Sequence, residues 1–303
     1  MSIKILKAGF HDLIQDLGRN GYTHMGISPT GAADNISFRI GNILLGNDAN
    51  EPGIEITLFG GSYYFNTDTI IALSGSVFTS DIDGDIIPFF KPLIVKSGQT
   101  LSIGTTTNGA RCYLSIKGGF QVPNILNSGS THLLSNTGGF KGRNLKINDK
   151  IICASLDDME IKNNLKFKMD DDRSILRVTK GLQYDLFDNA NKKLFFNEEF
   201  TVSHNSNRMG LRIRGPKIYS KLSKDILTEG LPLGAIQIPG DGDSIISFVD
   251  HQTTGGYPKF TNVITAYLHK VGQLKPGDKF MFKLVSNNEA ETLYFKQEKS
   301  LKI

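Results

Sequence analysis

A repeated pattern of short apolar runs between glycine or asparagine turns is the feature that most constrains this chain. The runs are roughly five to eight residues long and rich in Ile, Val, Phe and Thr. Glycine fills 32 of the 303 positions. β-Branched and aromatic runs of this length favour strands, so the chain is predicted to be mainly β. The clearest predicted strands are Ile70–Phe78, Leu93–Val95, Leu101–Gly104, Arg111–Lys117, Lys150–Ala154, Ile175–Thr179, Phe200–His204, Ser244–Val249 and Lys279–Val285.

Helical signals are few. The best one begins at Asp34, a natural N-cap, continues through apolar residues of Phe38–Leu44 on one broad face, and ends at Gly46. Thr261–Val271 satisfies neither the helical nor the strand period. It is interpreted either as a strand followed by a helical turn or as one short helix.

The length indicates two domains, since roughly 150 residues per domain is usual. Ser155–Arg173 is polar and weakly patterned, which predicts a linker between domains at 1–160 and 174–303. Leu145–Cys153 reads LKINDKIIC and Leu274–Phe282 reads LKPGDKFMF. This echo indicates two related halves, although chance similarity of two turn-strand units is the alternative.

Composition and charge exclude several classes of protein. With 39% hydrophobic and 21% charged residues, the chain is neither collagen-like, coiled-coil nor disordered. Its 34 basic and 30 acidic residues are interleaved, so no nucleic-acid partner is expected. Without a long apolar run or a signal-peptide pattern, we expect a cytoplasmic protein with no membrane partner. Cys112 and Cys153 fit no metal or disulfide spacing and are expected to be buried thiols.

The common motifs of nucleotide, zinc-protease and hydrolase sites are absent from the sequence. Any ATP must therefore be held in another way. The six histidines lack the paired spacing of metal ligands, so no metal site is predicted.

Two N-terminal segments carry polar groups of interest. QDLGRNGY, from Gln15 to Tyr22, places the planar fork of Arg19 in a glycine-rich loop that suits a carboxylate or phosphate. The alternative is that Asp16 and Arg19 pair to hold a turn. Glu55 interrupts the apolar run GIEITL and either faces solvent or lines a cavity.

The C-terminal half concentrates polar residues at strand ends. The segments are NRMGLRIRGP from Asn207, TEGLPLGAIQIPGDG from Thr228 and DHQTTGGYP from Asp250. In the last one, two hydroxyls, two glycines and a Tyr-Pro pair follow a predicted strand, an arrangement typical of binding loops. A glycine-rich turn after a core strand is the alternative.

Four further segments belong with these: GISPTGAAD, NILLGN, GFQVPNILNSGST and GGFKGRNLKINDK. Together, all of these segments resemble the family of the C subunit of bacterial 5-oxoprolinase. The family is also known as KipA-like or allophanate hydrolase subunit 2, and it is similar to half of the biotin-dependent carboxyltransferase domain of urea amidolyase. The resemblance runs from about Ile5 to Phe282. It implies two tandem cyclophilin-like β-barrel domains with few short helices.

The resemblance also implies an activity and partners. The family opens 5-oxoproline to L-glutamate with ATP hydrolysis, and it acts with the A and B subunits of 5-oxoprolinase, of which the B subunit is KipI-like. ATP and Mg²⁺ are the implied cofactors, with their site on this chain or on one of those partners. The chain is expected to be inactive without them.

Candidate site residues are taken from the matching motifs. Those that could position water or Mg²⁺, and so are candidate catalytic residues, are Asp34, Glu55 and Asp250. Those that could bind substrate or phosphate are Gln15, Arg19, Arg208, Gln237, Thr253, Thr254, Gly255, Gly256 and Tyr257.

Two other functions are carried as alternatives. The chain could be a carboxyltransferase subunit that works with carboxybiotin, or a regulatory protein that binds a KipI-like kinase inhibitor. No biotin attachment site or carboxylase domain is found in this sequence, so the carboxyltransferase alternative needs other chains to supply them.

Overall fold

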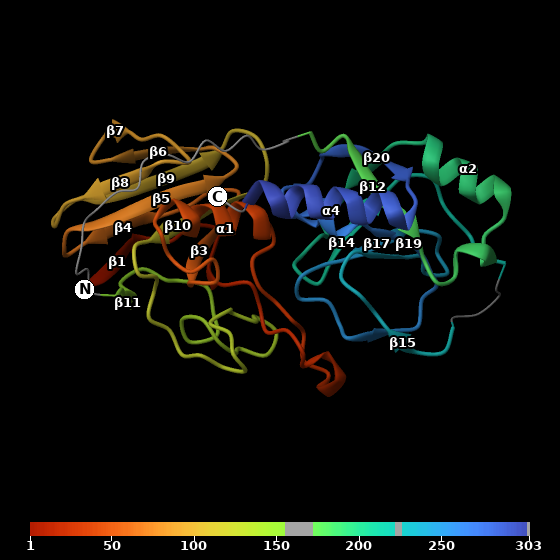
Figure 1. Ribbon diagram of the computed structural model, residues 1–303, viewed down its shortest axis with the longest axis horizontal. Helices are drawn as coiled ribbons and strands as arrows, with labels where there is room; N and C mark the ends of the chain where they lie inside the picture. Colours follow the sequence, from red (N-terminus) through yellow and green to blue (C-terminus); the bar gives the residue numbers. More distant parts are fainter. Residues whose placement is uncertain (155–171, 222–225, 302–303) are drawn as a thin grey trace. The chain divides into compact units, whose positions relative to one another are not determined.

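The computed structural model describes residues 1–154, 172–221 and 226–301, and it confirms a mainly β chain (Figure 1). The chain divides into two compact units, unit 1 with residues 1–19 and 30–169, and unit 2 with residues 20–29 and 170–303. Residues 155–171 of the predicted linker lie outside the described residues. The domain limits at 160 and 174 therefore stay predictions.

Unit 1 contains two antiparallel sheets. The six-stranded sheet has the order β11-β1-β4-β9-β6-β7, and the five-stranded sheet has the order β2-β3-β10-β5-β8. The strands of the first sheet are β1 (Ser2–Lys7), β4 (Ser62–Phe65), β6 (Phe78–Ile82), β7 (Asp85–Ile86), β9 (Thr100–Thr106) and β11 (Lys150–Ile152). The strands of the second are β2 (His11–Gln15), β3 (Gly53–Thr57), β5 (Thr69–Gly75), β8 (Pro92–Val95) and β10 (Arg111–Ile116).

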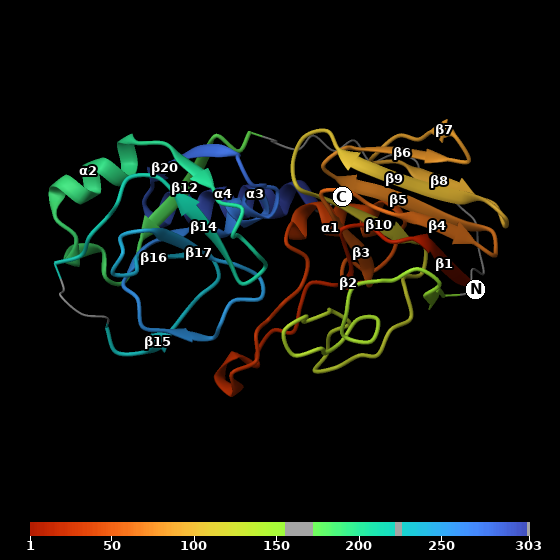
Figure 2. The same cartoon turned by 180° about the vertical axis from the view of Figure 1, so that it is seen from behind.

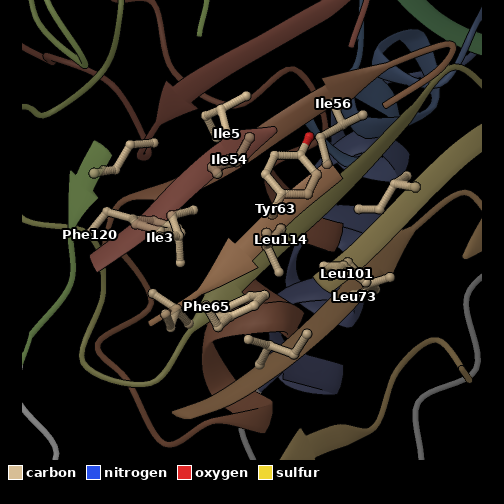
Figure 3. Close-up of a cluster of buried hydrophobic side chains, with 14 of the residues drawn as sticks. Ile3, Ile5, Ile54, Ile56, Tyr63, Phe65, Leu73, Leu101, Leu114 and Phe120 are labelled. Atoms are coloured by element: carbon tan, nitrogen blue, oxygen red, sulfur yellow. The ribbon is translucent and has the colours of Figure 1, made fainter. Parts of the chain in front are cut away.

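One apolar core lies between these two sheets (Figure 3). Ile3 and Tyr63 enter it from the first sheet, and Ile54, Ile56 and Leu114 enter it from the second. Because strand side chains alternate, Ile54 and Ile56 share the core face while Glu55 points to the opposite face of the sheet. The expected split of this strand into an apolar face and an acidic face is confirmed.

Helix α1 (Asn35–Leu44) packs on β5 and β10. As predicted, Asp34 is its N-cap, with Oδ1 accepting a hydrogen bond from the Ser37 amide at 2.9 Å. The helix passes close to the sheet at Gly41, where a Cβ would lie 2.6 Å from Ser115 Oγ and 2.8 Å from Ser74 Oγ. A larger residue at this position would push α1 off the sheet.

Unit 2 is built on a closed barrel with the strand order β12-β19-β16-β17-β14-β13-β20. A separate two-stranded ribbon pairs β15 (Glu229–Gly230) with β18 (Thr254–Gly255), and Figure 2 shows β15 apart from the barrel strands β14, β16 and β17. The barrel strands are β12 (Ile175–Lys180), β13 (Phe200–Val202), β14 (Gly210–Arg214), β16 (Ala235–Gln237), β17 (Ser244–Ser247), β19 (Lys259–Val263) and β20 (Lys279–Leu284).

Two helices of unit 2 are not anticipated by the sequence patterns. They are α2 (Asn189–Asn197) and α4 (Asn287–Leu301), and each buries only one side chain, Phe195 and Leu301 respectively. A helix that buries one residue has almost no apolar periodicity to detect. Phe195 still anchors α2 well, since its ring stacks 4.5 Å from that of Phe282. The other short elements are η1 (Thr23–Met25), η2 (Tyr184–Leu186), η3 (Thr265–Tyr267) and α3 (Leu268–Gly272).

Two sequence interpretations are corrected or settled by the fold. The predicted strand Ile70–Phe78 is two strands, because Gly75 has a φ of 94° and ends β5 before β6 begins at Phe78. Thr261–Val271 is a strand followed by helical turns, since β19 ends at Val263 and η3 and α3 follow. The first of its two interpretations is therefore confirmed.

Asp12 on β2 is a buried acid of unit 1, and it contacts Tyr63 of the apolar core. Its Oδ2 accepts hydrogen bonds from the Gly9 amide and the Tyr63 hydroxyl, both at 2.8 Å. Burial raises the pKa of Asp12 to about 6, because the charged form loses its hydration in the core. A raised carboxyl pKa means that the folded state holds this proton more tightly than the unfolded chain does.

Asp12 should therefore make the fold less stable as pH rises. Its contribution is most favourable below pH 4 and is lost as pH rises through about 6, and the gap between 3.8 and about 6 corresponds to at most about 3 kcal/mol. Denaturant unfolding at pH 4 to 8 should show wild type losing stability relative to Asp12→Asn over this window.

Asp68→Asn is the control, because hydrogen bonding from the Ser97 amide lowers the pKa of Asp68, an exposed carboxyl. Its lowered pKa gives the opposite sign, so wild type gains relative to that variant as pH rises toward the ordinary value of 3.8, and from about pH 5 to 8 the difference should stay constant. Parallel pH curves for wild type and Asp12→Asn would contradict the burial of a titrating Asp12.

Candidate functional site

Glu55 lies at the centre of a buried polar cluster in unit 1. Its Oε2 accepts hydrogen bonds from the Ala33 amide at 2.8 Å and from the Tyr113 hydroxyl at 2.9 Å. The Tyr113 oxygen in turn accepts from the Asp34 amide at 2.7 Å. Arg111 Nε lies 3.5 Å from Glu55 Oε1. Glu55 thus joins β3 and β10 to the segment that begins α1, and it is only 1% exposed.

The protonation state of Tyr113 follows from this environment. Burial, and then the negative charge of Glu55, raise the pKa of the phenol well above its ordinary value. Tyr113 therefore remains a hydrogen-bond donor to Glu55 at any ordinary pH. The sequence prediction left Glu55 either facing solvent or lining a cavity, and the structure instead places it against protein donors.

Arg19 is a buried cation that holds two loops of unit 1 together. Nη1 donates to Thr30 Oγ1 at 2.7 Å, and Nη2 donates to the Ser130 carbonyl at 2.6 Å. Gly138 leaves room for this guanidinium, since a Cβ there would lie 2.8 Å from Nη2. Two nitrogens of the Arg19 fork thus bond two different groups of this chain, and the predicted contact with a ligand carboxylate or phosphate stays a prediction.

The neighbouring carboxylate, Asp16, contacts the same loop as Arg19. It accepts hydrogen bonds from the Gly129 amide at 2.6 Å, from Ser128 Oγ at 2.8 Å and from the Gly18 amide at 2.7 Å. Gln15 joins the same segment, with Nε2 donating to the Thr131 carbonyl at 3.1 Å. Asp16 and Arg19 therefore stabilise the Ser128–Thr131 loop from two sides.

In unit 2, Arg208 and Asp250 form a bidentate ion pair. Arg208 Nε lies 2.8 Å from Asp250 Oδ2, and Nη2 lies 3.1 Å from Oδ1. The Asp250 amide also donates to the Arg208 carbonyl at 2.8 Å. The side chains are only 11% and 5% exposed, so this pair anchors the loop that follows Asp250.

His251 continues this anchored segment. It is buried, and its Nδ1 lies 2.7 Å from the Gln252 carbonyl oxygen. Burial lowers the pKa of His251, so the imidazole is neutral at pH 7 and donates to that carbonyl.

The loop Thr253–Tyr257 is held as one strand of the ribbon. Thr254 and Gly255 pair with Gly230 and Glu229, and the Thr253 and Gly256 carbonyls accept from the Leu231 and Ile226 amides at 3.0 and 2.9 Å. Alternation places Thr254 and Gly255 on opposite faces of the ribbon, with Thr254 exposed and Gly255 buried. Tyr257 is 36% exposed.

Beneath the ribbon lies a polar group that sequence reasoning missed. Lys259 on β19 is 1% exposed and forms an ion pair with Glu229 on β15. Gln183 Nε2 donates to the same Glu229 oxygen at 2.8 Å, and the Lys259 hydrogen bond lowers the pKa of Glu229. Lys259 is the first residue of β19 (KFTNV), so it does not interrupt an apolar run as Glu55 does, and no local pattern marks it.

The candidate residues fall into two sets, one in each unit. In unit 1, Asp34 and Glu55 meet through Tyr113, while Gln15 and Arg19 meet at the Ser128–Thr131 loop. In unit 2, Arg208 and Asp250 pair with each other, and Gln237 lies under Gly255. Their assignment to catalysis or substrate binding stays a prediction.

Several negative findings apply to the described part of the chain. Within it, no three His, Cys, Asp or Glu side chains gather as a metal site would require, and no helix is long and apolar enough to cross a membrane. Cys112 and Cys153 are buried free thiols, as expected.

Comparison with known proteins places this architecture in a family. Residues 25–284 match the model of the carboxyltransferase domain, subdomain A and B. The chain is 36% identical to the C subunit of 5-oxoprolinase from Escherichia coli, over 95% of this chain and 93% of that protein. It belongs to this 5-oxoprolinase C-subunit family of carboxyltransferase-domain proteins.

Members of this carboxyltransferase group also occur inside much longer proteins. The chain is 38% identical to urea amidolyase of Saccharomyces cerevisiae, over 99% of this chain but 18% of that protein. The crystal structure of Kluyveromyces lactis urea carboxylase superposes with a TM-score of 0.92 at 34% identity, over 99% of this chain and 29% of that one. The family resemblance inferred from the motifs is therefore confirmed.

Arg19→Lys should destabilise this family member even though it preserves the charge. An ammonium cannot reach Thr30 Oγ1 and the Ser130 carbonyl in the fork geometry, so one buried acceptor loses its donor at a cost of about 1–3 kcal/mol. Thermal unfolding measures this cost. If Arg19→Lys kept its stability but lost activity, the result would instead indicate that Arg19 binds a ligand.

A double-mutant cycle tests whether Arg208 and Asp250 act as one unit. Asp250→Ala should cost about 3 kcal/mol, because the Arg208 charge loses the carboxylate that compensates it while staying largely buried. Adding Arg208→Met should recover part of that loss. If the two losses add instead, the pair does not anchor the loop.

Proposed function

We propose that this chain is one subunit of an ATP-dependent 5-oxoprolinase complex that opens 5-oxoproline to L-glutamate. The observation that carries the proposal is the likeness to the C subunit of 5-oxoprolinase from Escherichia coli along 93% of that protein. The same subunit of Haemophilus influenzae is 35% identical over 95% of its length. Nearly the whole of each relative therefore has a counterpart here.

The reaction requires activation of a poor electrophile. Transfer of the γ-phosphoryl group of ATP to the lactam oxygen releases ADP and makes the ring carbon attackable. Water then adds to that carbon, the ring C–N bond breaks and the phosphate departs, which yields glutamate. The protein has to hold the lactam, orient water and neutralise phosphate charge.

In this proposal the nucleotide and Mg²⁺ are handled chiefly by partner subunits. The sequence has no phosphate-binding glycine loop, and the described residues gather no cluster of carboxylates for a metal. We therefore assign no step through Mg²⁺ to this chain. The proposed partners are the A and B subunits of 5-oxoprolinase, the second of which is KipI-like.

The role proposed for the three carboxylates is positioning. Asp34 caps α1, Glu55 accepts from Tyr113, and Asp250 pairs with Arg208. These contacts hold each carboxylate in one orientation. Their predicted catalytic role would need a substrate that displaces these partners.

The carboxyltransferase reaction is the second candidate. It is favoured by the TM-score of 0.92 with the urea carboxylase of Kluyveromyces lactis, a protein of which this chain spans 29%. That reaction moves a carboxyl group from carboxybiotin to an acceptor, so it would need carrier and carboxylase domains that have no counterpart in this chain. Capture of a KipI-like inhibitor is a third function, and it would use the same partner surface.

Reconstitution from purified subunits tests the proposal. Glutamate release with ATP and 5-oxoproline should appear only when this chain is combined with the A and B subunits, because the chain has no nucleotide motif of its own. Replacing 5-oxoproline by urea and bicarbonate, with carboxybiotin, is the control for the carboxyltransferase alternative. Turnover of 5-oxoproline by this chain alone would refute the proposal that partner subunits handle the nucleotide. Carboxylation of urea without glutamate release would refute the proposed reaction.

A further inference from the structure

The sequence contains two Asn-Gly pairs, Asn20–Gly21 and Asn108–Gly109. In such a pair the backbone nitrogen of glycine can attack the asparagine side-chain amide, because glycine has no Cβ to obstruct the approach. The intrinsic chemistry of the two pairs is therefore the same. Their surroundings in the fold are different.

The first pair lies in an exposed turn. Asn20 and Gly21 are both exposed, and a Cβ at Gly21, which has a φ of 94°, would meet no atom within 4 Å. Neither the Asn20 side chain nor the Gly21 amide forms a hydrogen bond with another residue that the structure describes. The Gly21 nitrogen is therefore open to solvent, and the Asn20 side chain can rotate toward it.

The second pair is fixed on both sides. Thr106 Oγ1 accepts a hydrogen bond from the Asn108 amide at 3.3 Å and donates one to the Gly109 carbonyl at 2.7 Å. Gly109 is buried although Asn108 is exposed, and the carbonyl of the next residue, Ala110, accepts from the Leu58 amide at 2.8 Å. Attack by the Gly109 nitrogen would have to displace these contacts.

We propose that Asn20 is a site of spontaneous deamidation and that the fold protects Asn108 from the same reaction. The Gly21 nitrogen first loses its proton to solvent hydroxide and attacks Asn20 Cγ, so that a new C–N bond closes a cyclic imide. The Cγ–Nδ2 bond breaks, and the side-chain nitrogen takes a proton from solvent and leaves as ammonia. Water then opens the imide at either carbonyl, which yields aspartate or isoaspartate.

The product changes the chain directly beside Arg19. A new carboxylate lowers the formal net charge of +4 by one. The isoaspartate form also adds a methylene to the backbone, immediately after the residue whose Nη2 donates to the Ser130 carbonyl at 2.6 Å. The modification therefore alters both the charge and the path of the chain where it leaves this buried contact.

The experiment compares the two pairs within one chain. The full wild-type chain is kept in mildly alkaline buffer, either folded or in denaturant, and each asparagine is followed by peptide mass spectrometry and by enzymatic detection of isoaspartate. In the folded protein, Asn20 should react at least about tenfold faster than Asn108, because only the first pair is unrestrained. In denaturant the two rates should become similar.

Two variants test the proposed route. Asn20→Gln should stop the reaction at position 20, because the longer side chain would have to close a larger and less favourable ring. Gly21→Ala is compared with wild type in denaturant, where the positive φ of this position imposes no strain, and it should react more slowly because the methyl group obstructs the attack. Both variants should leave the rate at Asn108 unchanged.

Three results would overturn the proposal. The first is the absence of deamidation at Asn20 in the folded protein, and the second is a rate at Asn108 that equals or exceeds the rate at Asn20. The third is a difference between the two sites that persists undiminished in denaturant, because it would then come from neighbouring residues in the sequence and not from the fold.

Discussion

The hydrogen bond from Tyr113 to Glu55 is the interaction on which unit 1 most depends outside its apolar core. It lies on the sheet face that carries α1, where a carboxylate would otherwise be buried without enough donors. Through the Ala33 and Asp34 amides, the same two side chains fix the residues that precede α1. A buried acid therefore orients the start of a helix, and the helix then covers the acid.

The same physical solution recurs in unit 2 with cations. Lys259 and Arg208 are each largely buried, and each has one carboxylate, Glu229 or Asp250, that compensates its charge. Buried charges of this kind add little net stability compared with apolar residues, but they are costly to break. Their effect is to give the ribbon and the loop after Asp250 one defined position relative to the barrel.

Some uncharged polar atoms of the barrel have no hydrogen-bond partner among the described residues, namely Gln237 Nε2, Ser244 Oγ, Thr261 Oγ1 and Asn262 Oδ1. They lie on β16, β17 and β19, which are neighbouring strands. Each such atom costs stability, because it gives up hydration without gaining a hydrogen bond. The buried charges of Lys259 and Asp250 are paired instead, because an unpaired buried charge costs more than an unpaired neutral group.

Local patterns in the sequence are enough to predict the mainly β class, the N-cap at Asp34 and the apolar face of Ile54 and Ile56, because each depends on neighbouring residues. The family is also predictable, because it depends on ordered motifs. They also identify Glu55 and Arg19 as unusual. They could not show that Glu55 meets Tyr113, or that Arg19 meets Ser130, since those contacts join residues 58 and 111 positions apart. Nor could they reveal α2 and α4, which bury one side chain each, or the ion pair of Lys259 with Glu229, which lies on another strand. Side-chain partners of this kind depend on long-range packing, which carries no local periodicity in the sequence.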